Sequence, residues 1–591
     1  MTVMTLEPLL WARCNQSLVA KIIGECAYEE CWEPTPLSKG EYELVIGDRS
    51  YRFHARQSIW GWLQVDPESI RCQGQEVSSA TEFLVNAQPD LKLNDIDLGN
   101  LLEEIQNTLY STYRQQERLL AYTAGDMVQL PAEELQSLLD GHPKAIANKG
   151  RIGWGTEELA LYAPESGQSV RLQLLLVHRS LCTVGYEPET DPWHLLQLHV
   201  SDEQNQVIDQ LLKDRGTTRS EYYPVPVHPW QWQRHINVQY QAWIQSGDII
   251  PVGELADDYL PQQSIRTFSN LRDRADYDIK LPLTILNTSC FRGIPGKHIE
   301  TGADLSQWLS SIVSEDPLLS GLVVQREICG IHCRHPVQEQ VAQTPYRYRE
   351  MLGVVWRESL QKFVNQDEQG ILMATLMQCD SRGKALVAEY IRRSGLAPEA
   401  WLRELFSKVV VPLYHLMAKY GVGLVAHGQN ISVILRDHVP VRVSVKDFHG
   451  DLRIVDQDFP ELADMPMQVK ACLTRFPAKY LIHDLVTGHF VTTLRFISPL
   501  VEEQCGVTEA RFYALLAESI SKYQKQHPEL AARYELFPMF TDTILKVCIN
   551  RVRFRIGYAD SAERPIPELG TPINNPLVLD RVTEHDYDTA S

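Results

Sequence analysis

Residues 424–450 read LVAHGQNISVILRDHVPVRVSVKDFHG and place a polar cluster, His-Gly-Gln-Asn at 427–430, beside short apolar segments. The alternation of apolar side chains predicts β-strands at three segments, residues 422–426, 431–435 and 441–445. A short polar turn joins the last two segments, so we expect them to form a hairpin. Asp447 follows the returning strand and would come back to the end of the hairpin where the polar cluster lies.

This arrangement has two readings. Asn and Asp cap turns in many loops, and such capping alone would explain both residue types here. Alternatively, the carboxylate of Asp447 and the amide oxygen of Asn430 would converge at one sheet edge. Oxygen ligands of this kind suit Mg²⁺, which retains several waters in its coordination shell. We favour a magnesium site with Asn430 and Asp447 as metal ligands.

The rest of the chain mixes helical and strand patterns, which predicts an α+β or mixed α/β fold. Helices are expected at three segments, residues 18–30, 98–120 and 397–420. The last of these has apolar residues at helical spacing and ends at Gly421, a residue type that commonly ends helices. Residues 42–65 alternate as strands.

The length and the net charge of the chain restrict the class of protein. A chain of 591 residues should form roughly three or four units rather than one core. Lys and Arg number 56 against 76 Asp and Glu, which gives a formal net charge of −20. Such a charge argues against nucleic acid or an anionic membrane as a partner. An anionic ligand would therefore need a local basic pocket.

Compartment signals favour a soluble cytoplasmic protein. The 12 cysteines have no zinc-like spacing, and reduced thiols are typical of the cytosol. The first residues lack the basic segment and cleavage site of a signal peptide. No apolar stretch approaches the roughly 18 residues of a membrane span, because His415 and Lys419 interrupt the longest candidate.

A second polar cluster has the residue types that hold phosphates. Hydroxyl groups, guanidinium groups and backbone amides in Gly-containing loops bind phosphate oxygens. Lys280 is expected to begin an apolar strand, and Arg292 follows the far end of that strand. The candidate phosphate-binding residues are Ser264, Arg266, Thr267, Lys280, Asn287, Thr288 and Arg292. The competing reading is a polar strand end with a surface arginine.

Two further basic segments could contact an anion. Residues 141–155, GHPKAIANKGRIGWG, carry Lys149 and Arg151 among glycines and could clamp a polyphosphate, although no Walker pattern is present. Residues 544–557, ILKVCINRVRFRIG, are expected to form a strand that contains Lys546 and places Arg551, Arg553 and Arg555 on one face. A solvated basic loop and a basic edge strand are the competing readings.

Together these clusters predict a site for a nucleotide, Mg²⁺ and an anionic second substrate. A kinase would need a carboxylate to orient and deprotonate a hydroxyl group. The corresponding loop position holds Gln429, which cannot accept a proton. An ionised carboxylate that attacks the α-phosphorus needs no such base, so carboxylate activation fits better. A small-molecule kinase and a catalytically inactive scaffold are the alternatives.

Six segments carry a resemblance to a known family: GHPK…NKGRIGWG, PVHPWQWQ, KLPLTILNTSCFRGIPG, AHGQN, KDFHGD and YLIHDLVTGHFVTTLRFISPL. With them the chain resembles the IucA/IucC family of siderophore synthetases over nearly its whole length. Many members have a second His-Pro in the Gly-rich loop, where this chain has Ala145-Ile146. No role of that missing histidine is therefore transferred.

The resemblance implies residue roles. Nucleotide contacts fall on Ser264, Arg266, Lys280, Thr288, Arg292, His427, Gln429, Asn430 and Asp447. His427, Arg292 and Lys280 are expected to be catalytic, because they would lie close to the activated carboxylate or the α-phosphate. We assign His427, His142, Lys546 and Arg551 to binding of the acid substrate.

The resemblance also implies a reaction with ATP. A carboxylate attacks ATP to give an acyl adenylate and pyrophosphate, and an amine then displaces AMP to form an amide. An aerobactin-type member would join a citryl monoamide, a citrate derivative, to the hydroxylated amine N6-acetyl-N6-hydroxylysine. The alternative is closure of succinyl-hydroxydiamines into macrocyclic siderophores such as alcaligin, putrebactin or bisucaberin.

Finally, the resemblance implies an architecture of a cupped hand, usually dimeric. We expect a thumb at residues 1–155, fingers with the phosphate-binding strands at 156–385, and a palm at 386–591. The palm would contain the FhuF-like C-terminal region of such synthetases. A homodimer is expected.

Overall fold

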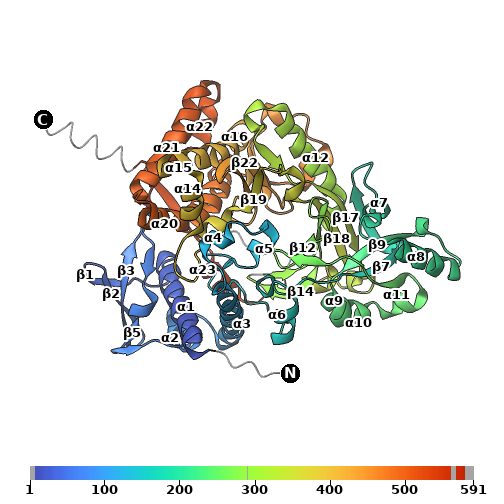
Figure 1. Cartoon of the computed structure of the whole chain (residues 1–591), viewed down its shortest axis with the longest axis horizontal. Coiled ribbons are helices and arrows are strands. Elements are labelled where there is room, and N and C mark those ends of the chain that lie inside the picture. Colours follow the sequence, from blue (N-terminus) through green and yellow to red (C-terminus); the bar gives the residue numbers. More distant parts are fainter. Residues whose placement is uncertain (1–6, 289, 559, 561–567, 579–591) are drawn as a thin grey trace.

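The computed structural model describes residues 7–288, 290–558, 560 and 568–578. Helices and several separate β-sheets share the chain, which confirms the predicted α+β class (Figure 1). In the view of Figure 1, the N-terminal segment lies at the lower left and the C-terminal helices lie above it. The segment around β7 and β9 forms the right-hand end. No described helix is long and apolar enough to cross a bilayer.

The N-terminal segment packs helices on a small antiparallel sheet. Helix α1 (Pro8–Tyr28) begins ten residues before the predicted start, with Pro8 in its first turn, where proline is tolerated. Its apolar face contacts α3 (Asp95–Leu119) and β4 (Leu63–Val65). The sheet has the order β1-β2-β3-β5-β6, with β4 paired to β3. Its other strands are β1 (Thr35–Ser38), β2 (Glu41–Ile46), β3 (Arg49–Gln57), β5 (Arg71–Cys72) and β6 (Gln75–Glu76).

Besides the two-stranded sheet of β14 (Leu283–Asn287) and β15 (Cys290–Arg292), the described middle of the chain contains two larger sheets. The larger has the order β11-β12-β13-β18-β17-β8, and α12 (Ile299–Glu315) contacts β17 and β8. Its strands are β8 (Cys182–Tyr186), β11 (Tyr259–Pro261), β12 (Thr267–Asn270), β13 (Tyr277–Lys280), β17 (Glu327–Cys333) and β18 (Gly353–Glu358). The smaller sheet contains β7 (Gln173–His178), β9 (Tyr222–Val227) and β10 (Ile249–Glu254).

The C-terminal part contains the sheet β16-β22-β21-β19, which is covered by helices. Its strands are β16 (Leu322–Val324), β19 (Glu368–Leu372), β21 (Ile431–Arg436) and β22 (Val439–Val445). A separate short sheet has the order β20-β23-β24 and is formed by β20 (Val422–Leu424), β23 (Leu452–Val455) and β24 (Thr474–Phe476). Among the helices, α14 (Leu386–Ser394) and α15 (Pro398–Leu405) contact β22, and α20 (Arg495–Cys505) packs on α14.

The predicted hairpin is confirmed as β21–β22. Ile431 pairs with Val445, and Lys446 N donates to Asn430 O at 3.2 Å, so Asp447 does return to the polar end. At the opposite end Asp437 and His438 both have positive φ, 49° and 65°, as a two-residue turn with strand-matched twist requires. The register of this hairpin therefore positions the candidate metal ligands.

The predicted helix over 397–420 is confirmed with one irregularity. Residues 406–410 form a π-helical turn between α15 and α16 (Val411–Tyr420). A π turn inserts a residue into the hydrogen-bond ladder, and here it precedes Pro412, which cannot donate to that ladder. Gly421 ends the helix at φ 64°, as predicted.

Two local predictions were wrong. Lys280 is the last residue of β13 rather than the first residue of the following strand, because Leu281 and Pro282 separate β13 from β14 (Leu283–Asn287). The basic C-terminal segment is a strand only at β25 (Thr543–Cys548), which pairs with β26 (Glu568–Asn574). Its arginines lie on the short helix α23 (Asn550–Ile556), so they do not share one strand face.

A buried ion pair ties the N-terminal helix to the C-terminal part. Arg495 on α20 donates to both carboxylate oxygens of Glu25 on α1, at 2.8 and 2.9 Å. Both residues are fully buried, and the guanidinium group also lies over the Tyr28 ring at 4.4 Å. The pair stabilises the junction only while both partners are present, because a lone buried charge is costly.

We expect Arg495→Met to lower the free energy of unfolding by about 3–5 kcal/mol, because Glu25 would lose its bidentate partner. The double variant Glu25→Met/Arg495→Met should recover most of this loss. Arg403→Met is the matched control, since Arg403 makes exposed ion pairs and should change stability by less than about 1 kcal/mol. Thermal and urea unfolding measure all three. Equal losses for Arg403→Met and Arg495→Met would contradict the assignment.

Candidate active site

One large cavity brings together most of the predicted site residues. Its volume is about 930 Å³, within the range of ligand pockets. It is lined by segments from α1, from the loop before Arg151, from residues 263–292 and from the polar end of the hairpin, residues 427–430 and 447–451. The predicted residues that line it are His142, Lys149, Arg151, Ser264, Arg266, Lys280, Asn287, Thr288, Arg292, His427, Gln429, Asn430 and Asp447.

The charge of this cavity is opposite to that of the whole protein. Seven Lys and Arg residues line it against four Asp and Glu, whereas the chain carries −20. A basic pocket on an acidic protein concentrates positive potential where an anion would bind. The predicted local basic pocket is therefore present.

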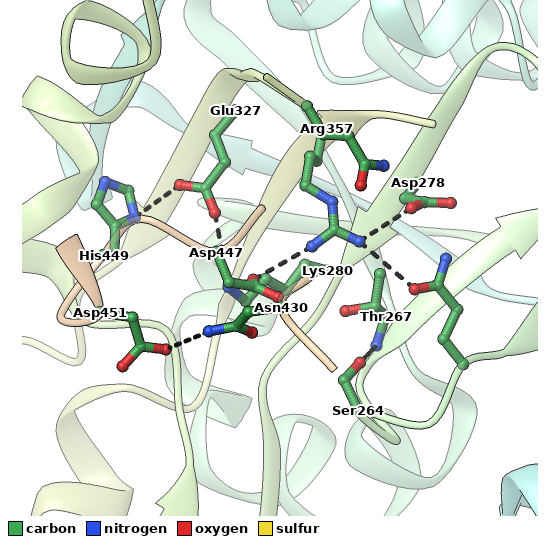
Figure 2. Close-up of polar contacts among 12 residues, drawn as sticks. Ser264, Thr267, Asp278, Lys280, Glu327, Arg357, Asn430, Asp447, His449 and Asp451 are labelled. Atoms are coloured by element: carbon green, nitrogen blue, oxygen red, sulfur yellow. Dashed lines mark hydrogen bonds and ion pairs between the residues drawn. The ribbon is translucent and has the colours of Figure 1, made fainter. Parts of the chain in front are cut away.

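An ion-pair network at the end of β22 joins two sheets (Figure 2). Lys280 Nζ, from β13, lies 2.5 Å from Asp447 Oδ1, and Arg357 Nη1, from β18, lies 3.2 Å from the same oxygen. Arg357 also donates through Nη2 to Asp278 at 2.9 Å. Burial alone would raise the pKa of Asp447, but the charges of Lys280, Arg357 and Lys446 outweigh burial and hold it well below its usual range. Asp447 is therefore ionised at neutral pH.

Glu327 extends the network and was not predicted. Its carboxylate oxygens lie 3.6 Å from Lys280 Nζ and 2.8 Å from His449 Nδ1 (Figure 2). Burial opposes ionisation, yet His449 and Lys280 lower the pKa of Glu327 to about 2. Glu327 is also the cross-strand partner of Arg357. Charged residues in otherwise apolar strands, REICG at 326–330 and GVVWRE at 353–358, were the available signal.

Hydrogen bonds orient the polar loop 427–430. His427 Nδ1 accepts from the backbone N–H groups of Gln429 and Asn430, at 3.2 and 3.3 Å. Burial lowers the pKa of His427, although Asp451 and Asp447 oppose that effect. The neutral ring therefore carries its proton on Nε2, which can donate to a ligand.

The amide of Asn430 is also held in one orientation. Its Nδ2 donates to Asp451 Oδ2 at 3.2 Å (Figure 2). The same nitrogen donates to Val425 O, also at 3.2 Å. With the nitrogen held by these acceptors, the amide oxygen is the atom left for a cation. No group of three or more His, Cys, Asp or Glu that could hold a metal occurs in the described ranges. Mg²⁺ needs fewer protein ligands when phosphates complete its shell.

The phosphate-binding candidates lie on tight turns. Ser264 Oγ accepts from Thr267 N at 3.2 Å, which fixes the turn before β12. Arg292, at the end of β15 (Cys290–Arg292), donates to Asn287 O at 2.7 Å and to Thr288 Oγ1. These contacts hold the guanidinium group against its own hairpin. No carboxylate among the described residues pairs with it, so its charge is available to a ligand anion.

Strained backbone concentrates around the cavity. Four non-glycine residues that line it have positive φ: Arg151 at 39°, Ile265 at 71°, Thr288 at 61° and Asp447 at 62°. Two of them are β-branched, for which this conformation is especially unfavourable. Strain of this kind persists where the surrounding structure holds a residue in a functional position.

Lys149 and Arg151 line the cavity but are already engaged. Arg151 forms a bidentate pair with Glu165, with Nη2 at 2.9 Å from Oε2, and Lys149 Nζ donates to Gln115. Burial lowers the pKa of Lys149, and the nearby Glu165 only partly opposes this. Both side chains therefore shape the wall of the cavity more than they add free charge.

Three predicted contacts need correction. Thr267 is buried on β12 and does not line the cavity, so its role is limited to the turn at Ser264. Lys546 and Arg551 also lie outside the cavity lining. Lys546 pairs with Glu30, and Arg551 pairs with Glu30 and Glu568. We therefore withdraw these two residues as acid-binding groups.

Comparisons with known proteins identify the family of the chain. A model of the IucA / IucC family matches residues 132–378, and a model described as ferric iron reductase FhuF-like transporter matches residues 399–561. The chain is 41% identical over 571 residues to aerobactin synthase of Escherichia coli, covering 96% of this chain and 98% of that protein. The chain belongs to the IucA/IucC family. The cavity residues from positions 139–151, 263–292 and 427–451 lie within the segments that these two models match.

The chain is also similar to a solved structure and to a second kind of synthase. The structure of aerobactin synthetase IucC from a hypervirulent pathotype of Klebsiella pneumoniae matches with a TM-score of 0.87 at 39% identity, covering 97% of this chain and 99% of that one. Putrebactin synthase of Shewanella sp. (strain MR-4) is 29% identical over 561 residues, covering 93% of this chain and 88% of that protein.

The pKa of Glu327 leads to a prediction about acid stability. Its value of about 2 in the folded protein lies below the unfolded value near 4.5, so its contribution is fully present above about pH 4.5. That contribution is lost as the pH falls towards 2. We expect Glu327→Gln to be less stable than wild type at pH 7 and to lose less stability between about pH 5 and 3. Parallel pH dependence of Tm in both proteins would contradict this.

Proposed function

We propose that this IucA/IucC-family protein is an aerobactin synthase. It uses ATP to adenylate the free carboxylate of a citryl monoamide and joins the acyl group to the amine of N6-acetyl-N6-hydroxylysine. AMP and pyrophosphate are the other products. The observation that carries the proposal is the single basic cavity where Arg292, Lys280, His427 and Asp447 meet.

Cationic and hydroxyl groups on one side of this cavity suit the phosphates of ATP. Ser264 and Thr288 offer hydroxyls from tight turns, and Arg266, Lys280 and Arg292 offer charge. Negative charge builds on the α-phosphate as the carboxylate attacks it. Donors preorganised at that position lower the barrier. We assign this role to Lys280 and Arg292.

The residues fit a magnesium ion. The Asn430 oxygen and the ionised Asp447 carboxylate provide hard oxygen ligands at one edge of the cavity, and Asp451 holds the amide in place. Bound together with ATP, Mg²⁺ would offset charge on the phosphate oxygens. Asp447 already neutralises Lys280 and Arg357, so its carboxylate serves both the fold and the site.

The neutral His427 suits a carboxylate substrate better than a hydroxyl substrate. Its Nε2–H can donate to a carboxylate oxygen, and Nδ1 is occupied by two backbone donors. Gln429 supplies an amide where a kinase would need a base. An acid that is ionised at neutral pH attacks without losing a proton, so this arrangement favours acyl adenylation. His142, also on the cavity wall, is a further candidate for contact with the acid.

A macrocyclising synthetase of succinyl-hydroxydiamines is the second candidate, since putrebactin synthase is also a relative. The sequence identity to aerobactin synthase, 41%, is higher than the 29% to putrebactin synthase, and this favours the aerobactin synthase proposal. Cytoplasmic location, the homodimer and the division into thumb (1–155), fingers (156–385) and palm (386–591) stay predictions. Sedimentation velocity would test the dimer.

Identification of the products tests the function directly. The protein is incubated with ATP, Mg²⁺, the citryl monoamide and N6-acetyl-N6-hydroxylysine, and the products are measured by mass spectrometry. We expect AMP, pyrophosphate and aerobactin. Succinyl-hydroxycadaverine and succinyl-hydroxyputrescine are the comparison substrates, and faster turnover of either would favour the macrocyclase. Formation of ADP in place of AMP would overturn the ligase proposal.

We expect Arg292→Ala to reduce acid-dependent pyrophosphate exchange about 10²- to 10³-fold, because it removes a charged donor to the α-phosphate. The fold should be retained, since Arg292 binds only its own hairpin in the hydrogen bonds described. Arg52→Ala, which truncates a 63% exposed arginine outside the cavity, is the control. Circular dichroism verifies folding, and near wild-type exchange by Arg292→Ala would reject its role.

A further inference from the structure

A second part of the cavity lies beyond the residues assigned to ATP and Mg²⁺. We call it the N-terminal lobe, formed by Arg13, Ser17 and Lys21 of α1 with Trp62, Phe496 and Leu500. None of these residues was predicted from the sequence as a site residue. The mechanism proposed above assigns no role to them.

Helix α1 presents a polar stripe to this lobe. Arg13, Ser17, Lys21 and Glu25 are spaced four residues apart, which places them on one helix face, and all four line the cavity. Glu25 is neutralised by Arg495. Within the described part of the chain, no carboxylate pairs with Arg13 or Lys21. The stripe therefore contains two cations, Arg13 and Lys21, that form no ion pair with a described carboxylate.

Lys21 is held at the junction of the lobe with the rest of the site. Its Nζ donates to His142 O at 3.0 Å, and His142 and His427 line the same cavity. One hydrogen bond to a neutral carbonyl leaves two ammonium protons for a ligand. Burial lowers the pKa of Lys21 to about 8, with Glu25 and Asp140 opposing, so the group is mostly charged at neutral pH.

Another part of the lobe lining is apolar. Trp62 and Phe496 pack edge to face with ring centroids 5.1 Å apart, and Leu500 lines the cavity one helical turn after Phe496. Aromatic and aliphatic surface of this kind suits a chain of methylene groups. A ligand that carries an anion at one end of an alkyl chain would match both parts of the lining.

We propose that Lys21, with Arg13, binds the α-carboxylate of an N-acyl-N-hydroxylysine arm whose alkyl chain packs on Trp62 and Phe496. The inference rests on the proposed function, in which both substrates carry such an arm. The amine substrate has a free α-carboxylate, and the citryl monoamide has the same group on the arm already attached. Lys21 and Arg13 are therefore specificity residues for the lysine-derived carboxylate.

The test compares substrates with and without that carboxylate. The amine is N6-acetyl-N6-hydroxylysine or N-acetyl-N-hydroxycadaverine, which differs only by loss of the carboxylate. The acid is the citryl monoamide of either amine. Pyrophosphate exchange with the acid alone reports on the acid, and amide formation at saturating acid reports on the amine. The full chain is measured as wild type and as Lys21→Met, Lys21→Arg, Arg13→Met and Lys39→Met.

For the carboxylated form of one of the two substrates, we expect Lys21→Met to raise KM about 10- to 100-fold, as loss of a charged hydrogen bond predicts. The decarboxylated analogue should bind wild type and Lys21→Met alike. Lys21→Arg should recover most of the affinity, and Arg13→Met should show a smaller change in the same direction. Lys39→Met, which alters an exposed lysine outside the cavity, should match wild type.

The assay that responds to Lys21→Met shows which of the two substrates carries the carboxylate that Lys21 binds. A change confined to exchange assigns Lys21 to the acid, and a change confined to amide formation assigns it to the amine. Equal losses with carboxylated and decarboxylated substrates, or no loss with either, would overturn the inference. Failure of the proposed function itself would look different, because wild type would then show no acid-dependent exchange.

Discussion

Burial of charge at the junction of two sheets is the constraint on which the rest of the structure depends. Asp447 enters this junction from the end of β22, while Lys280 and Arg357 enter from β13 and β18. An unpaired charge at such a position costs several kcal/mol, so the two sheets can meet only where the acids and bases are in register. Lys280 and Asp447 also line the cavity, and folding and ligand binding therefore rely on the same contacts.

A second buried ion pair imposes the same constraint on the contact between α1 and α20. Glu25 and Arg495 lie 470 positions apart in the chain, and their contact fixes α1 against α20. The contact places the polar stripe of α1 beside the segment that carries Phe496 and Leu500. Residues from the two ends of the chain thus form one cavity with positive charge, on a protein whose surface is strongly acidic. An anionic ligand would be attracted locally, although the protein as a whole repels it.

Local patterns predicted much of this arrangement. The alternation around Asn430 predicted the hairpin, and Gly421 correctly marked the end of the preceding helix. Most candidate site residues were found in one cavity because polar groups at strand ends cluster where strands meet. The basic C-terminal segment shows the limit of such patterns, since alternating arginines suit one strand face and also occur on the helix α23.

The sequence by itself determined most of the element types, the polar hairpin end and the residue types available to the site, because these follow from spacing, turn residues and side-chain types that are local in the chain. Only the tertiary structure decided which charges are free. Arg357 and Glu327, which were not predicted, belong to the ion-pair network of the site. Arg551, which was predicted, pairs with Glu568 outside the cavity, and Arg151 is neutralised by Glu165. Such outcomes depend on partners distant in sequence, and the energy of a charge depends on its burial and its neighbours, which no local pattern specifies.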